Sequence, residues 1–161
     1  MDVVNFYSVS DEFGQFSNFA PFPIRVDGER WLTSEHYFQA QKFEDKVYRQ
    51  RIQKAKTPML AAALGRDRKQ KLRRDWESAK VSVMRTALLA KFAQLEELRE
   101  LLLSTGGAKI VEHTENDDYW GDGGDGSGKN MLGRILMEVR EQLRSGLAQQ
   151  AVAEDAAPRR R

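Results

Sequence analysis

Two long runs of apolar residues with helical spacing constrain the fold of this chain more than any other feature. In the first run, apolar side chains recur every three or four residues over 83–102, ahead of Gly106-Gly107. In the second run, one stripe comprises Met131, Leu132, Ile135, Leu136, Val139 and Leu143. Such spacing places apolar side chains on one face of a helix. We therefore expect one long helix that Asp75 caps and that continues through Leu102, and a second helix over residues 131–143 whose stripe faces the core.

Shorter elements are predicted elsewhere along the chain. Residues 3–9 indicate a short strand, residues 108–113 another, and residues 22–33 a hairpin, because alternating apolar runs flank the favoured turn Asp27-Gly28. Three short helices are expected: one that Ser34 caps and that begins at Glu35, one over residues 45–56, and one that begins at Thr57-Pro58 and ends at Gly65. The predicted fold is mainly α (α+β), a compact multi-helical domain with a small antiparallel sheet near the N-terminus.

Composition excludes several kinds of site and segment. The chain of 161 residues has no cysteine, which excludes disulfides, thiolate zinc sites and a cysteine nucleophile, and its two histidines argue against a multi-histidine metal site. No apolar run reaches the roughly 18 residues that a membrane helix needs. The first residues have no basic start and no continuous apolar segment, so no secretory signal is expected. We expect a cytoplasmic protein without a metal.

One domain is expected over residues 1–144, because this length is enough for a substantial core. From about Ser145 the chain turns to Ala, Gln and Glu and ends in three arginines. That composition predicts a disordered tail over residues 145–161.

Positive charge is concentrated in one segment of an otherwise balanced chain. The 26 basic and 24 acidic residues give a net charge of +2, so the bulk field does not imply nucleic-acid binding. Residues 66–74, however, hold six cations and one anion. Two interpretations stay open: a solvated helix face or connector, and a funnel for phosphate or nucleic acid.

A glycine-rich segment, residues 121–128, follows an acidic stretch and precedes the last predicted helix. Gly121, Gly123 and Gly126 fit G-x-G-x-x-G, but no buried strand comes directly before them, so a dinucleotide fingerprint is rejected. The P-loop pattern fails because Asn130 follows Lys129 where Ser or Thr is required, and the EF-hand pattern fails on the spacing of its acidic residues. Two interpretations remain: a mobile acidic connector, and a backbone cradle for an anion at a helix N-terminus that Asn130 caps.

Three segments together resemble one known family. They are SNFAPFPIRVDGERWLTSEHYFQAQKF (17–43), DWESAKVSVM (75–84) and VEHTENDDYWGDGGDGSGKNMLGRILMEVR (111–140). In this order they are similar to the NADAR superfamily, of the YbiA-like kind, over roughly residues 4–143. The resemblance implies a compact, mainly helical domain that handles ribosylated nucleobase compounds.

The resemblance also implies a reaction. YbiA-like members are N-glycosidases that cleave phosphoribosylamino-pyrimidine intermediates of riboflavin biosynthesis, which are damaging if they accumulate, and other members remove ADP-ribose from guanine bases. Both substrates join ribose C1 to an exocyclic amine of a base. The implied activity is hydrolysis of that C–N bond on a small phosphoribosylated molecule, with no cofactor.

Acidic residues of the motifs are the catalytic candidates, because C–N cleavage places positive charge on C1 and the ring oxygen. Glu35 and Asp117 match acids of the family motifs, and Glu112 is a weaker candidate. Each has an ordinary structural alternative: a first-turn helix carboxylate for Glu35, a turn-forming aspartate for Asp117 and an exposed strand end for Glu112.

Lys80 is a third catalytic candidate, because it lies one turn after Trp76 on the same predicted helix face. A desolvated lysine can form a Schiff base with C1 of an opened ribose and expel the base amine. This covalent route competes with direct attack by water, and a solvated helix lysine is the structural alternative.

Further motif residues are candidates for holding the substrate. Those expected to shape the base and ribose site are Asn18, Phe19, Trp76, Trp120, Gly121 and Asn130, and those expected to hold phosphate are Arg73, Arg74 and Lys129 with the N–H groups of the glycine loop. Both tryptophans are predicted to stack on the base, against the alternative of ordinary core packing. Asp122 and Asp125 are expected to order the loop.

Two other functions stay open. One is removal of ADP-ribose from guanine in nucleic acid, which the basic segment 66–74 favours slightly. The other is a sensor that binds ADP-ribose or a nucleotide without turnover. Binding alone does not need Glu35, Asp117 and Lys80 together, which argues against the sensor.

Overall fold

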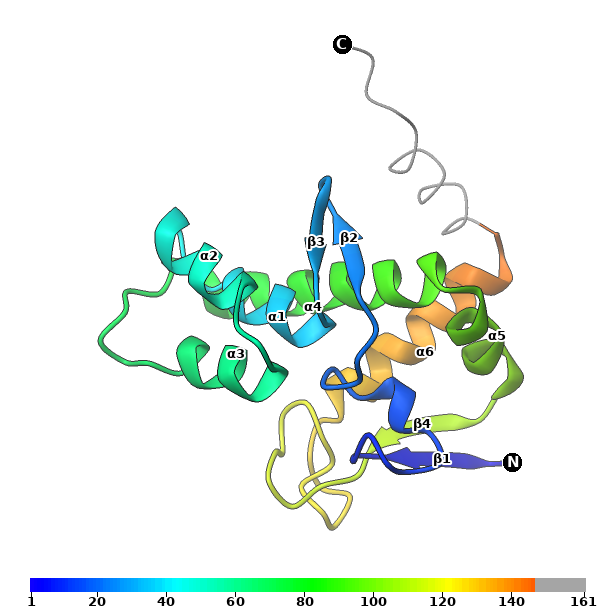
Figure 1. Cartoon of the computed structure of the whole chain (residues 1–161). Coiled ribbons are helices and arrows are strands. Elements are labelled where there is room, and N and C mark those ends of the chain that lie inside the picture. Colours follow the sequence, from blue (N-terminus) through cyan, green and yellow to red (C-terminus); the bar gives the residue numbers. More distant parts are fainter. Residues whose placement is uncertain (147–161) are drawn as a thin grey trace.

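Helices are the main regular elements of the computed structural model, which describes residues 1–146 (Figure 1). The helices are α1 (Ser34–Ala40), α2 (Lys46–Gln53), α3 (Pro58–Gly65), α4 (Trp76–Gln94), α5 (Glu96–Ser104) and α6 (Met131–Arg144), with one 3-10 turn, η1 (Gly14–Phe16). The strands are β1 (Val3–Phe6), β2 (Ile24–Val26), β3 (Glu29–Trp31) and β4 (Lys109–Glu112). The prediction of a mainly helical α+β fold is confirmed. Nearly all of the tail predicted over residues 145–161 lies outside the described residues.

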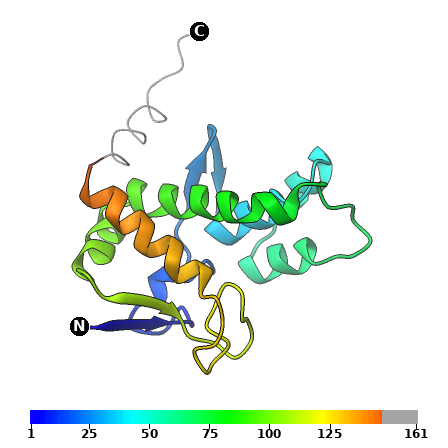
Figure 2. The same cartoon turned by 180° about the vertical axis from the view of Figure 1, so that it is seen from behind.

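Helix α4 crosses the molecule and separates two apolar clusters. One cluster joins α4 to β1, β4, α5 and α6, and the view from behind shows α6 lying across α4 (Figure 2). The other cluster joins the opposite face of α4 to the β2–β3 hairpin and to helices α1, α2 and α3. The stripe predicted over residues 131–143 is core, as its spacing indicated, except for Met131, which is half-buried. No helix in the described part of the chain is both long and apolar enough to cross a membrane.

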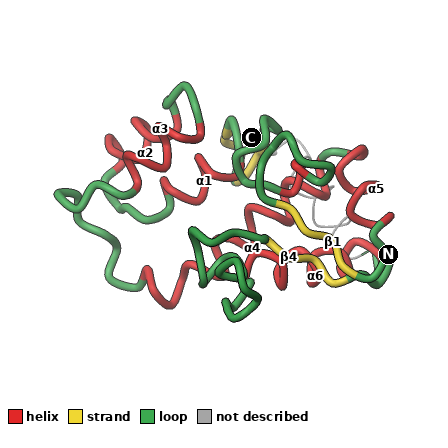
Figure 3. The backbone as a smooth tube through the Cα atoms, turned by 90° about the horizontal axis from the view of Figure 1, so that it is seen from below, coloured by secondary structure: helices red, strands yellow, loops and turns green. Residues whose placement is uncertain are grey.

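The strands form two separate pairs, and only one of them is antiparallel. The β2–β3 hairpin is antiparallel and turns at Asp27-Gly28, whose φ angles of 52° and 78° suit the predicted two-residue turn. Strands β1 and β4 pair in parallel, with Val3 opposite Lys109 and Phe6 opposite Glu112, and they lie side by side when seen from below (Figure 3). The expected antiparallel hairpin near the N-terminus is therefore confirmed, whereas the parallel pairing of β1 with β4 was not predicted.

Two helix boundaries differ from those predicted. Helix α1 begins at Ser34, and the hydroxyl of Thr33 caps it by accepting a hydrogen bond from the N–H of His36. The long helix predicted through Leu102 is interrupted at Leu95, where extended backbone (φ −107°, ψ 109°) separates α4 from α5. The apolar spacing continues across this break because both helices pack their apolar faces on the same core.

Asp75 and Asn130 precede helices as predicted, but neither side chain caps one. The Asp75 carboxylate pairs with Arg73 at 2.6 Å and makes no capping hydrogen bond. Asn130 takes a left-handed conformation (φ 51°), and its side chain reaches back to β4. There its Oδ1 accepts from the N–H of Glu112 at 3.0 Å and its Nδ2 donates to the carbonyl of Ile110 at 2.9 Å. Asn130 therefore fastens the start of α6 to the end of β4.

Gly133 permits this close approach, and its replacement tests it. A Cβ atom at Gly133 would lie 2.1 Å from the carbonyl oxygen of Ile110, which is backbone and cannot move aside. Alanine favours a helix over glycine by about 1 kcal/mol, but we expect the clash to dominate, so that Gly133→Ala lowers the free energy of unfolding by about 3 kcal/mol. Denaturant titration measures this loss.

Gly107→Ala is the matched control, because a Cβ atom there would meet nothing within 4 Å. Its free energy of unfolding should stay within about 1 kcal/mol of the parent value. Equal stability of the Gly133 and Gly107 variants would contradict the close approach between α6 and β4.

Candidate active site

A cavity of about 760 Å³ opens between segments that are far apart in the sequence. Its walls come from the end of β1, the loop over residues 17–19, the inner face of α1, the start of α3 and the segment that follows β4. The predicted site residues among its lining are Asn18, Phe19, Glu35, Glu112, Asp117 and Trp120. The fold thus brings three acids and one tryptophan from three different segments around one space.

Glu35 lies in the first turn of α1 and points into the cavity. Its side chain is buried, and Oε1 accepts a hydrogen bond from Nε2 of Gln39 at 2.7 Å. Burial raises the pKa of Glu35, while the Gln39 hydrogen bond and the positive charges of Lys42 and Arg66 act in the opposite direction. Glu35 is therefore more than a solvated first-turn carboxylate, because its carboxyl group is held within a polar cluster of the cavity wall.

Asp117 is held in place by the backbone of its own turn. Its Oδ1 accepts hydrogen bonds from the N–H groups of Tyr119 at 2.9 Å and Trp120 at 2.8 Å. This is the aspartate turn expected as its structural alternative. Asp117 also lines the cavity, so the same side chain can hold the turn and face a ligand.

Glu112 ends β4 and lines the same cavity. Burial raises its pKa to about 7, and the negative charges of Asp117, Glu35 and Asp122 contribute to the shift. Its Oε2 atom is shielded from solvent and has no hydrogen-bond partner among the described residues. The candidate judged weaker from the sequence is therefore a cavity acid whose pKa is clearly raised, as is that of Glu35.

The loop that carries Asn18 and Phe19 is held in place by side chains of α1 and α4. Oδ1 of Asn18 accepts from the hydroxyl of Ser34 at 2.7 Å, and its Nδ2 lies 3.4 Å from the sulfur of Met84. The carbonyl of Ser17 accepts from Nζ of Lys91 at 2.8 Å. Lys91 is completely buried, and burial lowers its pKa to about 7.

The two predicted stacking tryptophans lie in different environments. Trp120 lines the cavity, and its ring meets Phe38 edge-on with 5.4 Å between the ring centroids. Trp76 is 6% exposed, packs against Phe38 with 5.2 Å between the ring centroids, and belongs to the core. Trp120 is therefore in a position to stack on a ligand in the cavity, whereas Trp76 packs on Phe38 in the core.

Lys80 is not among the described residues that line the cavity. Its Nζ lies 2.7 Å from Oε2 of Glu77 and 4.1 Å from the ring centroid of Tyr119. It therefore packs on the outer side of the loop that carries Asp117. Its catalytic role stays a prediction that this position does not favour.

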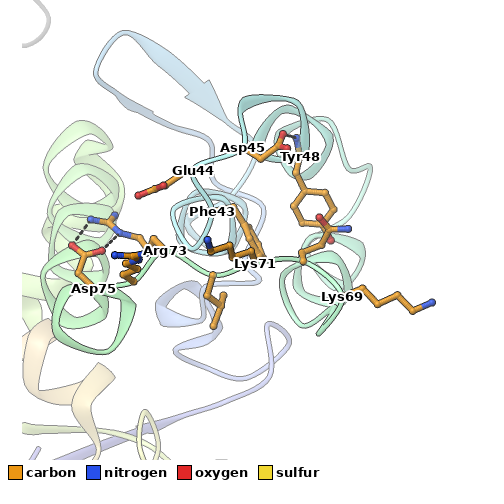
Figure 4. Close-up of a pocket in the computed structure, with 11 residues that line it drawn as sticks. Phe43, Glu44, Asp45, Tyr48, Lys69, Lys71, Arg73 and Asp75 are labelled. Carbon is orange, nitrogen blue, oxygen red and sulfur yellow. Dashed lines mark hydrogen bonds and ion pairs between the residues drawn. The ribbon is translucent and has the colours of Figure 1, made fainter.

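The cations predicted to hold phosphate face other parts of the surface. Arg73 and Arg74 line a second hollow of about 660 Å³ between α2 and the connector to α4, where Arg73 pairs with Asp75 (Figure 4). Lys129 lines a third hollow of about 520 Å³ beneath the glycine-rich segment. None of these three belongs to the described lining of the cavity with the acids.

Backbone hydrogen bonds join the two ends of the glycine-rich segment. The N–H groups of Asn130, Met131 and Leu132, which begin α6, donate to carbonyls of Gly121, Tyr119 and Trp120. The predicted anion cradle at this helix N-terminus is therefore wrong, because those donors already have partners within the loop. The close packing of the loop on the end of β4 also explains Gly121, where a Cβ atom would lie 2.9 Å from the carbonyl oxygen of Glu112.

Asp122 organises the segment, as expected. Its carboxylate accepts from the N–H groups of Thr114 and Gly124 and from Nδ1 of His113 at 2.7 Å. Burial would raise the pKa of Asp122, but these hydrogen bonds outweigh burial and hold it below its usual range. Asp125 similarly accepts from the N–H and hydroxyl of Ser127.

Two cations of the cavity were missed from the sequence. Lys42 lies two turns after Glu35 on the same face of the α1 segment, and burial lowers its pKa while Glu35 opposes the shift. Arg66 follows α3 at the rim, is exposed and makes no ion pair within the described residues. The seven-residue spacing from Glu35 was a usable signal for Lys42. No sequence signal singled out Arg66 from its basic run.

Comparison with known proteins agrees with these features. A model of the NADAR domain matches residues 5–144. N-glycosidase YbiA of Escherichia coli (strain K12) is 64% identical over 141 residues, which are 88% of this chain and 88% of that protein. A riboflavin biosynthesis protein of Vibrio vulnificus is 44% identical over 140 residues, which are 87% of this chain and 38% of that protein. The NMR structure of the E. coli protein YbiA has a TM-score of 0.85 and 63% identity, and the match covers 90% of this chain and 86% of that one.

Proposed function

The chain belongs to the NADAR domain family, and we propose that its cavity hydrolyses the C–N bond between ribose C1 and the exocyclic amine of a phosphoribosylamino-pyrimidine. The enzyme class follows from the relatives, since a protein 64% identical over 88% of both chains is an N-glycosidase. The chain is a hydrolase of N-glycosyl compounds. The pyrimidine substrate is supported by the riboflavin biosynthesis protein that shares this domain.

One observation carries the proposal: three carboxyl groups and two cations face a single cavity. The acids are Glu35, Glu112 and Asp117, and the cations are Lys42 and Arg66. Cleavage of an N-glycosidic bond needs a carboxylate beside C1, a proton for the leaving amine and a positive site for the phosphate. A protein that only bound a nucleotide would gain nothing from three acids next to a phosphate.

Asp117 is the carboxylate that we assign to C1. Its hydrogen bonds from Tyr119 and Trp120 fix Oδ1, which leaves Oδ2 for the substrate. As the C–N bond lengthens, this carboxylate stabilises the positive charge on C1 and the ring oxygen and accepts a proton from the attacking water. Trp120, adjacent in the same turn, offers its face to the base.

Arg66 is the residue that we assign to the phosphate, in place of Arg73 and Arg74. We expect Arg66→Gln to raise KM for the phosphorylated substrate about ten- to a hundredfold, because a charged hydrogen bond is worth roughly 1.5–3 kcal/mol. The value of kcat should change little, since the contact is equal in ground and transition states. Steady-state kinetics with the phosphorylated and dephosphorylated substrates measures this.

Arg68→Gln is the matched control for Arg66, because Arg68 is an exposed cation two residues away that lines none of the three hollows described above. Its KM should stay within about twofold of the parent value, as exposed charges contribute little. An equal rise in KM for both variants would contradict a specific contact between Arg66 and the phosphate. It would mean that the overall positive charge of the basic segment attracts the substrate.

A covalent mechanism needs an amine that lines the cavity, and Lys42 meets this condition where Lys80 does not. Its Nζ lies 3.4 Å from the carbonyl of Gly65, and burial lowers its pKa, which favours the nucleophilic neutral amine. Borohydride reduction during turnover, followed by peptide mass spectrometry, separates the routes. A reduced adduct on Lys42 supports the covalent route, and its absence under turnover supports direct attack by water.

Hydrolysis assays test the function itself. We would offer 5-amino-6-(5-phosphoribosylamino)uracil and ADP-ribosylated guanosine in parallel and measure the released base by mass spectrometry. Turnover of the pyrimidine that Asp117→Asn abolishes supports the proposal. Turnover of the guanine adduct alone overturns the pyrimidine substrate, and binding of ADP-ribose without any turnover overturns the enzyme.

A second candidate function is removal of ADP-ribose from guanine in nucleic acid. It is favoured by the course of the basic segment, which runs from Arg66 at the cavity rim to Lys69, Lys71 and Arg74 in the second hollow (Figure 4). Such a path suits the phosphates of a polymer. Affinity for a modified oligonucleotide should then fall steeply with salt, whereas affinity for the small metabolite should fall only mildly.

A further inference from the structure

We propose that Glu112 is the general acid of this active site: its protonated carboxyl group delivers a proton to the exocyclic nitrogen as the C–N bond breaks. The proposal rests on the N-glycosidase function above and adds a division of labour between the acids. Asp117 acts at C1, and Glu112 acts on the departing amine.

The backbone fixes the direction of the Glu112 side chain. Its N–H donates to Oδ1 of Asn130 at 3.0 Å, and its carbonyl accepts from the N–H of Asp122 at 2.9 Å. With both backbone groups held, the side chain projects from the end of β4 into the cavity. The strand end is thus locked from two sides, and the carboxyl group has a defined position.

The carboxyl group itself has a free hydrogen-bonding position. Oε2 of Glu112 is shielded and has no partner among the described residues. Buried polar atoms are nearly always paired, so an unpaired one in a cavity wall indicates a partner that arrives with the ligand. A protonated carboxyl group at this position can donate to a nitrogen of the substrate.

The surrounding charges favour the protonated form. Burial raises the pKa of Glu112 to about 7, and the negative charges of the loop residues Asp117 and Asp122 and of Glu35 in α1 add to the shift. The cations of the cavity, Lys42 and Arg66, act on Glu35 instead. The wall around Glu112 therefore favours a carboxyl group that still holds its proton when the substrate binds.

The reaction then balances with water as the only co-reactant. The C1–N bond breaks, its electron pair stays on nitrogen, and the proton of Glu112 completes the amine of the released base. A water oxygen bonds to C1 and gives its proton to Asp117. Transfer of that proton through solvent to Glu112 restores both groups, and the products are the free base and ribose 5-phosphate.

Leaving-group dependence tests this role. We would compare N-(5-phosphoribosyl) derivatives of aniline and of 4-nitroaniline, because nitroaniline departs with much less help from a proton donor. Glu112→Gln should slow hydrolysis of the aniline compound about a hundredfold or more and of the nitroaniline compound less than about tenfold. Equal losses on both compounds would show a structural role and overturn the proposal.

The pH profile is the second readout. In the parent enzyme kcat/KM should fall as the pH rises through about 7, because Glu112 loses its proton there. Glu112→Gln should lose this alkaline limb. Glu115→Gln, a carboxyl-to-amide change in the same segment at an exposed residue outside the cavity lining, is the matched control and should keep the profile.

A direct titration separates failure of this proposal from failure of the enzyme function. With ¹³C-carboxyl-labelled glutamate, the resonance that disappears in Glu112→Gln reports the proton of Glu112 without any turnover. A carboxylate already ionised at pH 5.5 overturns the proposal even in an active enzyme. A parent protein that hydrolyses no N-glycosyl compound overturns both the function and the assignment of Glu112.

Discussion

Replacing Asp117 by asparagine is expected to lower kcat/KM for a phosphoribosylamino-pyrimidine by about a thousandfold. The amide oxygen of asparagine can still accept the hydrogen bonds from Tyr119 and Trp120, so the turn should persist. The negative charge beside C1 is lost, and with it the group that accepts the proton of water. Losses of about 10² to 10⁴ are typical when such a group is removed. Release of the base, followed by mass spectrometry, measures the rate.

Asp118→Asn is the control, because Asp118 is the next residue, is exposed and does not line the cavity. It removes the same charge from the same turn and should keep nearly full activity. Thermal unfolding should give similar midpoints for both variants. If Asp117→Asn kept more than about a tenth of the parent activity while folded, the carboxylate at C1 would have to be another acid of the cavity.

Lys91→Met is expected to stabilise the protein at pH 6 and to lose this advantage at high pH. In the unfolded chain Lys91 holds its proton up to its ordinary pKa of 10.5, whereas burial lowers the pKa in the folded protein to about 7. Between these values the unfolded state binds more protons, so the free energy of unfolding of the parent protein rises with pH. Below pH 7 both states are protonated, and the cost of burying the charge is present in full.

The size of the effect follows from the pH range between the two pKa values of Lys91, about 7 in the folded protein and 10.5 in the unfolded chain. Each pH unit contributes up to about 1.4 kcal/mol, so the parent protein should gain about 3 kcal/mol relative to Lys91→Met between pH 7 and pH 9.5. At the upper end the variant should be the less stable, because the carbonyl of Ser17 has lost its donor. Denaturant titrations at several pH values measure the difference in free energy of unfolding between the two proteins. The other titrating groups are common to both proteins, so their contributions cancel in this difference.

Lys46→Met provides the comparison, because Lys46 is exposed at the start of α2. Its stability difference from the parent should be small and should not vary between pH 6 and pH 9.5. A constant difference for Lys91→Met as well would mean that Lys91 stays protonated in the folded protein throughout this range.

Sequence periodicity predicted the helices well because it reports which face of a segment is buried. It missed the break at Leu95, since the apolar positions of α4 and α5 face one core and keep their spacing through the interruption. Periodicity also could not predict that β1 pairs with β4, because nothing in the sequence of a strand identifies a partner about a hundred residues away or the direction in which the two strands pair. Local signals fix local structure, and long-range pairing depends on the packing of everything between.

The candidate site shows the same division. Family motifs predicted that Glu35, Asp117 and Trp120 share one site, and the three residues line one cavity although Glu35 is far from the other two in the sequence. Trp76 was assigned to the site by the same motifs and lies in the core, because a motif does not distinguish a residue that touches the ligand from one that supports its neighbour. Among six cations in one basic run, only the fold selects the one at the rim.

The parallel pairing of β1 with β4 has a consequence for how the chain folds. Residues 3–6 are synthesised about a hundred residues before residues 109–112, the strand beside them in the finished structure. The end of β1 and the segment after β4 are also two walls of the cavity. Contacts of such long sequence separation form late, because the loop between them must close first. The active site is therefore assembled only after β4 and the segment that follows it have been made, and until then β1 has no partner strand.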